Sequence, residues 1–171
     1  MNLLKYQRAA LRTAQPTREH TLRLAVAGLG LSEEAAEVLD VVRQGAEHDK
    51  VVLEIGDLVW YGAELASAFG ISLGAIDTHP RDCDDDPWSL ADDLVISTGI
   101  LTGTVKKTIG HGHPVDEAKI TALLQAVFVD VATLSASMGS DLATVCEANI
   151  AKLRRRYPDG FSTERSQNRP D

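Results

Sequence analysis

Two short acidic pairs, each spanning one helical turn, stand in consecutive apolar stretches of the chain. The first pair is Glu34 and Glu37, and the second is Glu54 and Asp57. Because a helix advances by about 100° per residue, the two acids of a pair lie about 60° apart on one face and can hold one cation. Carboxylate oxygens are hard ligands that suit Mg2+ or Mn2+. The spacing predicts a divalent metal site.

Each acidic pair lies beside an apolar stripe of the kind that faces a protein core. The first stripe is Leu31, Ala35, Val38, Leu39 and Val42, and the second is Val51, Ile55, Leu58, Gly62 and Leu65. If two helices pack antiparallel with these stripes facing, all four acids converge on one open face. Like charges so placed raise one another's pKa unless a cation is present. The alternative is a set of acids scattered on a solvated surface.

The composition favours a single all-α domain, a helical bundle of two related hairpins. Only 5% of the 171 residues are aromatic, and strand-like alternation is scarce. The net charge of -8 opposes binding to nucleic acid backbones. Cys83 and Cys146 lack the spacing of a disulfide framework or a zinc site. Without an apolar run near ~20 residues or a signal peptide, we expect a cytoplasmic protein with no membrane partner.

Periodicity and turn residues predict six helices. They cover residues 2–14, 17–44, 48–69, 88–109, 114–138 and 141–157, and the second of them is open to loosening at Gly28–Gly30. The polar stretch 77–87 is expected to be a linker between two halves, about 1–76 and 88–160. The segment ending at Phe69-Gly70 resembles the one ending at Met138-Gly139, which indicates a degenerate internal duplication. The tail from Phe161 is expected to be loosely ordered.

Two further stretches complete a recognisable pattern. The chain carries Tyr6-Gln7 with Arg12-Thr13 near its start and reads Asn149-Ile-Ala-Lys-Leu-Arg-Arg-Arg-Tyr-Pro-Asp-Gly-Phe161 near its end. With an ExxE motif followed by ExxD after sixteen residues, the chain resembles the MazG-like all-α nucleoside triphosphate pyrophosphohydrolases. The resemblance covers both ends and the first hairpin, whereas residues 77–148 match the family only as a degenerate repeat.

The resemblance implies Mg2+-dependent hydrolysis of a nucleoside triphosphate to the monophosphate and pyrophosphate, with Mn2+ as a substitute metal. It implies that Glu34, Glu37, Glu54 and Asp57 bind the metal and that Glu33 and Glu34 are catalytic. Glu33 would bind a further ion or orient the attacking water, and a solvated helix residue is the alternative. Many relatives have a glycine directly before the first acidic motif, whereas this chain has Glu33 there, which makes water positioning less secure than the four ligands.

The expected substrate-binding residues are Asn149, Lys152, Arg156, Tyr157 and Lys106. The first three lie on one helical face and can present donors to a triphosphate. Cations in a last helical turn are also favoured by the helix dipole without any ligand, and Lys106 can equally be a solvated lysine. Trp60 and Tyr61 directly follow the second acidic pair, so either can stack a base or pack in the core.

Three functions stay open at this point. The leading one is the pyrophosphohydrolase, whose partners are the nucleotide and, for a pair of such chains, a second copy in a homodimer. The second is a catalytically silent nucleotide-binding or regulatory protein of the same fold. The third is a structural helical adaptor, which predicts that the acids do not converge.

Overall fold

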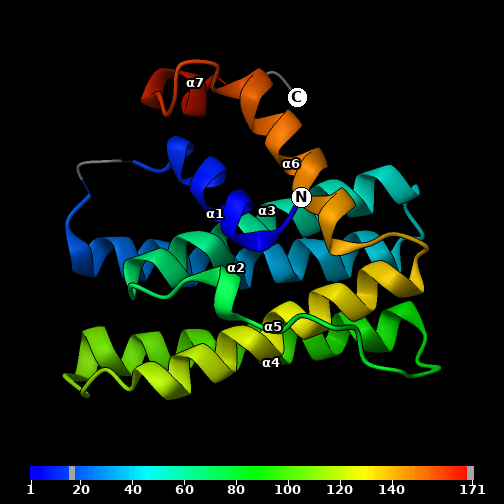
Figure 1. The fold of residues 1–171 in the computed structure, drawn as a ribbon, viewed down its shortest axis with the longest axis horizontal. Helices are drawn as coiled ribbons and strands as arrows, with labels where there is room; N and C mark the ends of the chain where they lie inside the picture. The colour runs from blue at the N-terminus through cyan, green and yellow to red at the C-terminus, as the bar shows by residue number, and fades with distance from the viewer. Residues whose placement is uncertain (16–17, 169–171) are drawn as a thin grey trace.

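The chain folds entirely into helices and connecting loops in the computed structural model, which describes residues 1–15 and 18–168 (Figure 1). The α-helices are α1 (Leu3–Ala10), α2 (His20–Arg43), α3 (His48–Ala68), α4 (Pro87–His111), α5 (Glu117–Ser137), α6 (Leu142–Arg156) and α7 (Thr163–Gln167), and the 3-10 turns are η1 (Leu11–Thr13) and η2 (Leu73–Ala75). No strand occurs within the described ranges. The predicted all-α fold is confirmed.

The six predicted helices correspond to α1 through α6, with ends that differ by a few residues. Thr17, the expected start of the second helix, lies outside the described residues. Helix α2 instead begins after Glu19, whose side chain accepts hydrogen bonds from the backbone N–H groups of Thr21 and Leu22. The predicted linker contains no helix up to Asp86, which caps α4 through its side chain.

Helix α2 runs without a break through Gly28 and Gly30, so the expected loosening there is wrong. Both glycines are buried because neighbouring helices approach them closely. A Cβ on Gly28 would lie 3.5 Å from Val105 of α4, and one on Gly30 would lie 2.2 Å from the Tyr61 ring of α3. The glycines therefore admit neighbouring side chains, and the helical hydrogen bonds continue past them.

The two antiparallel hairpins, α2 with α3 and α4 with α5, pack against each other as a four-helix arrangement (Figure 1). Helices α1 and α6 lie across the outer side of α3 and contact each other there. The predicted apolar stripes face the interior, with Leu39 alone among their ten residues only half-buried. This packing joins the two ends of the chain over the first hairpin.

The residues from 77 to 86 are held to the second hairpin through Arg81. Its guanidinium pairs with Asp93 of α4 at 3.1 Å and with the largely buried Asp130 of α5 at 3.2 Å. Its backbone N–H donates to the Thr133 hydroxyl at 2.9 Å. The linker is therefore anchored along α4 and α5. The division of the chain into two duplicated halves remains a prediction.

Helix α5 corrects the expectation that no segment is long and apolar enough to cross a membrane. It spans 21 residues and contains a stretch with a mean hydropathy of 1.6, which meets the length and composition of such a helix. Of that stretch, 56% is buried inside the protein, as in the core helix of a bundle. Its apolar character follows from its place between α4 and α3.

Candidate metal centre

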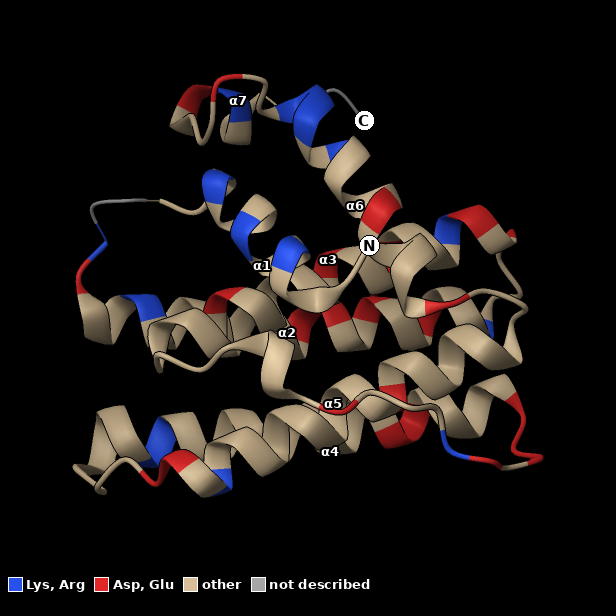
Figure 2. Ribbon diagram, viewed as in Figure 1, with Lys and Arg blue, Asp and Glu red and all other residues tan. Residues whose placement is uncertain are grey.

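Three of the four predicted acidic ligands converge where α2 crosses α3. Glu34 of α2 and both Glu54 and Asp57 of α3 place one carboxylate oxygen each within 4.8 Å of one another. The antiparallel hairpin produces this cluster because the second half of α2 lies beside the first half of α3, and acidic segments of the two helices adjoin there (Figure 2). All three side chains are half-buried.

Glu37, the fourth predicted ligand, does not belong to this group of three. It is exposed, and with Glu33, Asp40 and Glu54 it lines a shallow acidic groove of about 460 Å3 that Lys50 also borders. Glu33 is likewise exposed on that side. The two exposed acids still act on the cluster, because their negative charges help to raise the pKa of Glu34. Glu54 links the groove to the cluster.

Glu34 carries the clearest sign of an unmet requirement for positive charge. Its Oε2 atom is buried and has no hydrogen-bond partner among the residues that the structure describes. Burial, followed by the charges of Asp57, Glu37, Glu33 and Glu54, raises its pKa from 4.5 to about 8. Burial also raises the pKa of Glu54, against the opposing effect of Lys152.

Asp57 is held by two residues of α6. Asn149 Nδ2 donates to Asp57 Oδ1 at 3.0 Å, and the Lys152 ammonium pairs with Asp57 Oδ2. The Asn149 side-chain oxygen in turn accepts a 2.8 Å hydrogen bond from the Tyr6 hydroxyl. Both Tyr6 and Asn149 are fully buried. These two consecutive hydrogen bonds, from Tyr6 to Asn149 and from Asn149 to Asp57, therefore hold the Asp57 carboxylate in place from the side of the protein core.

This burial revises the role expected for Asn149. A fully buried amide whose oxygen and nitrogen are both engaged within the protein does not reach a ligand. Asn149 is therefore a positioning residue for Asp57. A Cβ on Gly56 would lie 2.9 Å from the Asn149 Cβ, so the glycine allows α6 to approach α3 this closely.

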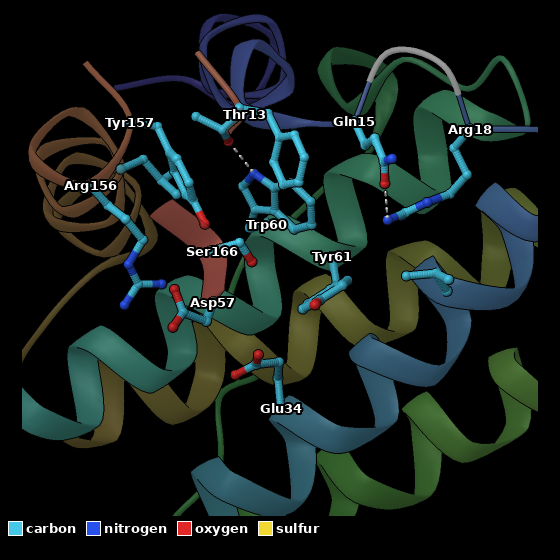
Figure 3. Close-up of a pocket in the computed structure, with 13 residues that line it drawn as sticks. Thr13, Gln15, Arg18, Glu34, Asp57, Trp60, Tyr61, Arg156, Tyr157 and Ser166 are labelled. Carbon is cyan, nitrogen blue, oxygen red and sulfur yellow. Dashed lines mark hydrogen bonds between the residues drawn. The ribbon is translucent and has the colours of Figure 1, made fainter. Parts of the chain in front are cut away.

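A pocket of about 180 Å3 opens directly beside the acid cluster, and Glu34 and Asp57 form part of its wall (Figure 3). Aromatic side chains from α3 and from the end of the chain face into it. Trp60 is oriented by its indole N–H, which donates to Thr13 Oγ1 at 2.9 Å. The lining residues are Thr13, Gln15, Arg18, Val26, Glu34, Asp57, Trp60, Tyr61, Leu153, Arg156, Tyr157, Phe161 and Ser166.

The C-terminal segment up to residue 168 closes one side of this pocket, contrary to the expectation of a loosely ordered tail, whose residues 169–171 lie outside the described part of the chain. Arg12 donates to the backbone oxygens of Tyr157 and Pro158 at 2.9 and 3.0 Å, which ties the end of α6 to η1. The rings of Tyr157 and Phe161 lie 5.9 Å apart, and Ser166 of α7 lines the same pocket. The motif stretches quoted from the sequence contained Thr13 and Phe161, but no pattern pointed to Ser166, Gln15 or Arg18.

The other predicted substrate-binding residues lie at different distances from the pocket. Arg156 and Tyr157 line the pocket, and Lys152 lies at its acidic wall through its pairing with Asp57. Lys106 is exposed on α4 and is not among the lining residues. It follows Val105, which packs on Gly28 of α2. The expected contact of Lys106 with substrate is therefore not supported by its position.

The donor set of the cluster fits a hard divalent cation. Three carboxylates approach one another, and the buried oxygen of Glu34 lacks any donor among the described residues. The cluster contains no His or Cys, so it offers only oxygen ligands. Such sites suit Mg2+ or Mn2+ rather than zinc.

The raised pKa values predict that stability falls as pH rises when no divalent cation is present. Between the ordinary value of 4.5 and about 8, folded Glu34 retains a proton that the unfolded chain has released. The folded state then binds more protons than the unfolded state, so the free energy of unfolding decreases with pH across this window. Urea denaturation in a chelator at pH 5 and pH 8 measures the change. Glu34→Gln should flatten it, and an undiminished decrease in that variant would contradict the assignment.

Comparison of the chain with protein-family models, with curated proteins and with solved structures finds no match in any of the three. The resemblance to MazG-like enzymes therefore stands on the motif residues alone. Any assignment of function has to be argued from the geometry of the acid cluster and the pocket.

Proposed function

We propose that the protein is a Mg2+-dependent nucleoside triphosphate pyrophosphohydrolase that releases the monophosphate and pyrophosphate. The observation that carries this proposal is the contact between two sites of different chemistry. A cluster of three carboxylates opens into a pocket lined by aromatic side chains, and Glu34 and Asp57 belong to both. A nucleotide has the matching division into an anionic triphosphate and a flat apolar base.

Glu34, Glu54 and Asp57 would hold the metal in this proposal. Bound there, Mg2+ would supply positive charge that polarises the phosphoryl group under attack and neutralises the leaving pyrophosphate. The protein's own contribution is positional: Asn149 fixes Asp57, and the helix crossing fixes Glu34 against Glu54. Glu33 and Glu37 are proposed to act from the acidic groove, where Glu33 would orient the attacking water and Glu37 would add a ligand through the groove side.

Lys152 and Arg156 are proposed to bind the phosphates. They lie four residues apart on α6, so their side chains project from one face. Arg156 lines the pocket, and the Lys152 ammonium already lies at the acid cluster. Both cations are thus placed between the carboxylates and the pocket, where the triphosphate would pass.

The aromatic part of the pocket is proposed to hold the base. Trp60 and Tyr61 meet edge to face with ring centroids 4.9 Å apart, and Tyr157 lines the same pocket (Figure 3). Gln15 and Arg18 are hydrogen-bonded to each other at 2.8 Å at the rim and offer donors and an acceptor to a base edge. Stacking on such rings binds a base without selecting it, so the polar rim would set the preference.

The experiment that tests the proposal is product identification with a panel of ribo- and deoxynucleoside triphosphates in the presence of Mg2+ or Mn2+. Formation of monophosphate and pyrophosphate in equal amounts, and only with metal, is expected for at least one nucleotide. Formation of diphosphate and phosphate would assign cleavage to a different bond and would contradict the proposal.

A catalytically silent nucleotide-binding protein is the second candidate, and one observation favours it. Both oxygens of Asp57 are already engaged, by Asn149 and by Lys152. In such a protein the Lys152 ammonium would replace the metal permanently. Nucleotide binding that is unaffected by a chelator, with no turnover of any triphosphate, would select this alternative.

Arg156→Gln is expected to raise the KM for the triphosphate by about 10- to 150-fold, because hydrogen bonds to charged groups contribute about 1.5–3 kcal/mol. The kcat should change less, since Arg156 lies on the pocket wall and outside the acid cluster. Arg155→Gln is the matched control, because it removes the same charge from a residue that is exposed and does not line the pocket. Steady-state kinetics that show equal effects of the two substitutions would rule out a specific role for Arg156.

A further inference from the structure

The outer face of α4 is apolar at its centre although it faces solvent. Ile96 and Ile100 are 61% and 54% exposed, unlike the apolar side chains that α4 turns inward. Gly99 lies between the two isoleucines, and Gly103 lies about one turn after Gly99. A Cβ built on either glycine would meet nothing within 4 Å. At about 100° per residue these four positions share one side of the helix, opposite the buried Leu94 and Leu101.

Charged residues flank this apolar centre with opposite signs. Asp92 and Asp93 lie about one turn before Ile96, and Lys106 and Lys107 lie about one turn after Gly103. Both aspartates are 49% exposed and both lysines are exposed. An acidic segment therefore lies near the start of α4 and a basic segment near its end (Figure 2). The midpoint of this arrangement falls between Gly99 and Ile100.

We propose that this face of α4 docks on the same face of a second copy of the chain, with the two helices antiparallel and crossing at Gly99 and Ile100. A two-fold axis at that midpoint places Ile96 opposite Gly103 of the second copy, so that a large side chain meets open space. The same rotation places Lys106 and Lys107 over the two aspartates of the second copy. Sizes and charges thus match at both ends, as an isologous contact requires.

The charge pattern selects a second copy over an unrelated partner. A partner of uniform charge would meet repulsion at one end of α4, whereas an inverted copy of α4 meets attraction at both ends. Asp92 and Asp93 already pair with Arg43 at 2.9 Å and with Arg81 at 3.1 Å. A carboxylate has acceptor sites for more than one donor, and half of each side chain remains exposed, so the lysines of the second copy can share them.

Exposed apolar side chains also occur on α2, the helix that packs beside α4. Helix α2 packs beside α4 through the hydrogen bond of 2.8 Å between the Ser32 and Thr102 hydroxyls. Its Leu29 is 67% exposed and its Leu22 is 53% exposed. Five of the six large hydrophobic side chains that are exposed in the described chain lie on α2 and α4, with Trp88 at the start of α4 among them. Docking through α4 would bring this apolar area under cover.

Gly103→Leu tests the contact between copies without destabilising the single folded chain. The open space around Gly103 accommodates the side chain, and leucine is a far better helix former than glycine, so the thermal unfolding temperature should not fall. Light scattering coupled to size exclusion should show a dimer for the natural chain and at least a tenfold weaker dimer for Gly103→Leu. Ala126→Leu on the exposed side of α5 is the control and should stay dimeric.

Charge exchange tests the antiparallel register. One chain carries Lys106→Asp with Lys107→Asp, and another carries Asp92→Lys with Asp93→Lys. Each chain alone has one sign at both ends of α4 and should be monomeric, whereas an equimolar mixture should form a mixed dimer. A natural chain that stays monomeric up to its solubility limit, or charge-exchanged chains that dimerise separately as well as the natural one, would overturn the proposal.

Discussion

Asp57→Asn is expected to abolish metal-dependent release of pyrophosphate, with a loss of at least about 100-fold. Changes that only disturb the surroundings of a metal ligand already cost 10–100-fold in affinity or activity, so removal of a ligand's charge should cost no less. Asparagine keeps the size of Asp57 and can still accept from Asn149, which limits the structural damage. The loss should appear both in turnover and in the binding of Mn2+ measured by electron paramagnetic resonance.

Glu54→Gln should behave in the same way, and two acids of the groove provide the comparison. Glu37 is exposed and lies outside the cluster of three, so Glu37→Gln should reduce activity less than Glu54→Gln does. Asp40→Asn is the matched control for a general change in local charge, because Asp40 lines the same groove without belonging to any predicted ligand set. Equal losses in Glu54→Gln and Asp40→Asn would show that net charge matters and that the cluster does not.

Asn149→Ala is expected to lower the free energy of unfolding by about 1–3 kcal/mol or more and to reduce activity as well. The substitution leaves the fully buried Tyr6 hydroxyl without its acceptor, and an unsatisfied buried donor carries a penalty of that size. It also frees Asp57 from its 3.0 Å hydrogen bond, so the metal ligand loses its orientation. Denaturant unfolding and Mn2+ affinity measure the two effects separately.

Tyr6→Phe separates the two roles of Asn149. It removes the hydroxyl but leaves the hydrogen bond from Asn149 to Asp57 in place, so it should cost stability with a smaller effect on metal binding. In the Asn149→Ala background, Tyr6→Phe should cost little or recover stability, because it removes the orphaned donor. Strictly additive effects in this double-mutant cycle would show that the Tyr6 hydroxyl and Asn149 do not act together.

Much of the architecture was predictable from local sequence. The helix start at Asp86 and the stops at Gly45 and Gly70 follow rules that act within a few residues. The apolar stripes identified the faces that pack, and those faces place Glu34 beside α3. This is why an antiparallel hairpin drawn from periodicity alone brought three acids of the predicted set together.

The remaining features depend on how far each helix is rotated and shifted against its neighbours. Glu37 and Glu34 are one turn apart on the same helix, yet only Glu34 reaches the cluster because α3 passes closer to it. Lys106 stays outside the pocket because the two hairpins meet at Ser32 and Thr102, a register that no local pattern encodes. The pocket wall from Ser166 depends on the path of the chain after α6.

The burial of Asn149 is a case in which a signal was present. It lies four residues after Val145 and four before Leu153, in the middle of the apolar stripe of α6. A polar residue at such a position needs a hydrogen-bonding partner inside the protein. That position predicts a structural role more strongly than a substrate contact, and Tyr6 and Asp57 are the partners that the fold supplies.

The composition of the pocket walls also determines when the pocket can form during synthesis of the chain. Its walls come from Thr13, Gln15 and Arg18, from α2 and α3, and from the chain between Leu153 and Ser166. The Tyr6–Asn149 and Arg12–Tyr157 hydrogen bonds join positions 143 and 145 residues apart. Contacts of such sequence separation form late because a long loop must close first. The two hairpins can therefore fold while the chain still emerges from the ribosome, but the pocket closes only after α6 and the residues that follow it are free. A chain that still lacks α6 would expose the acid cluster without this pocket beside it.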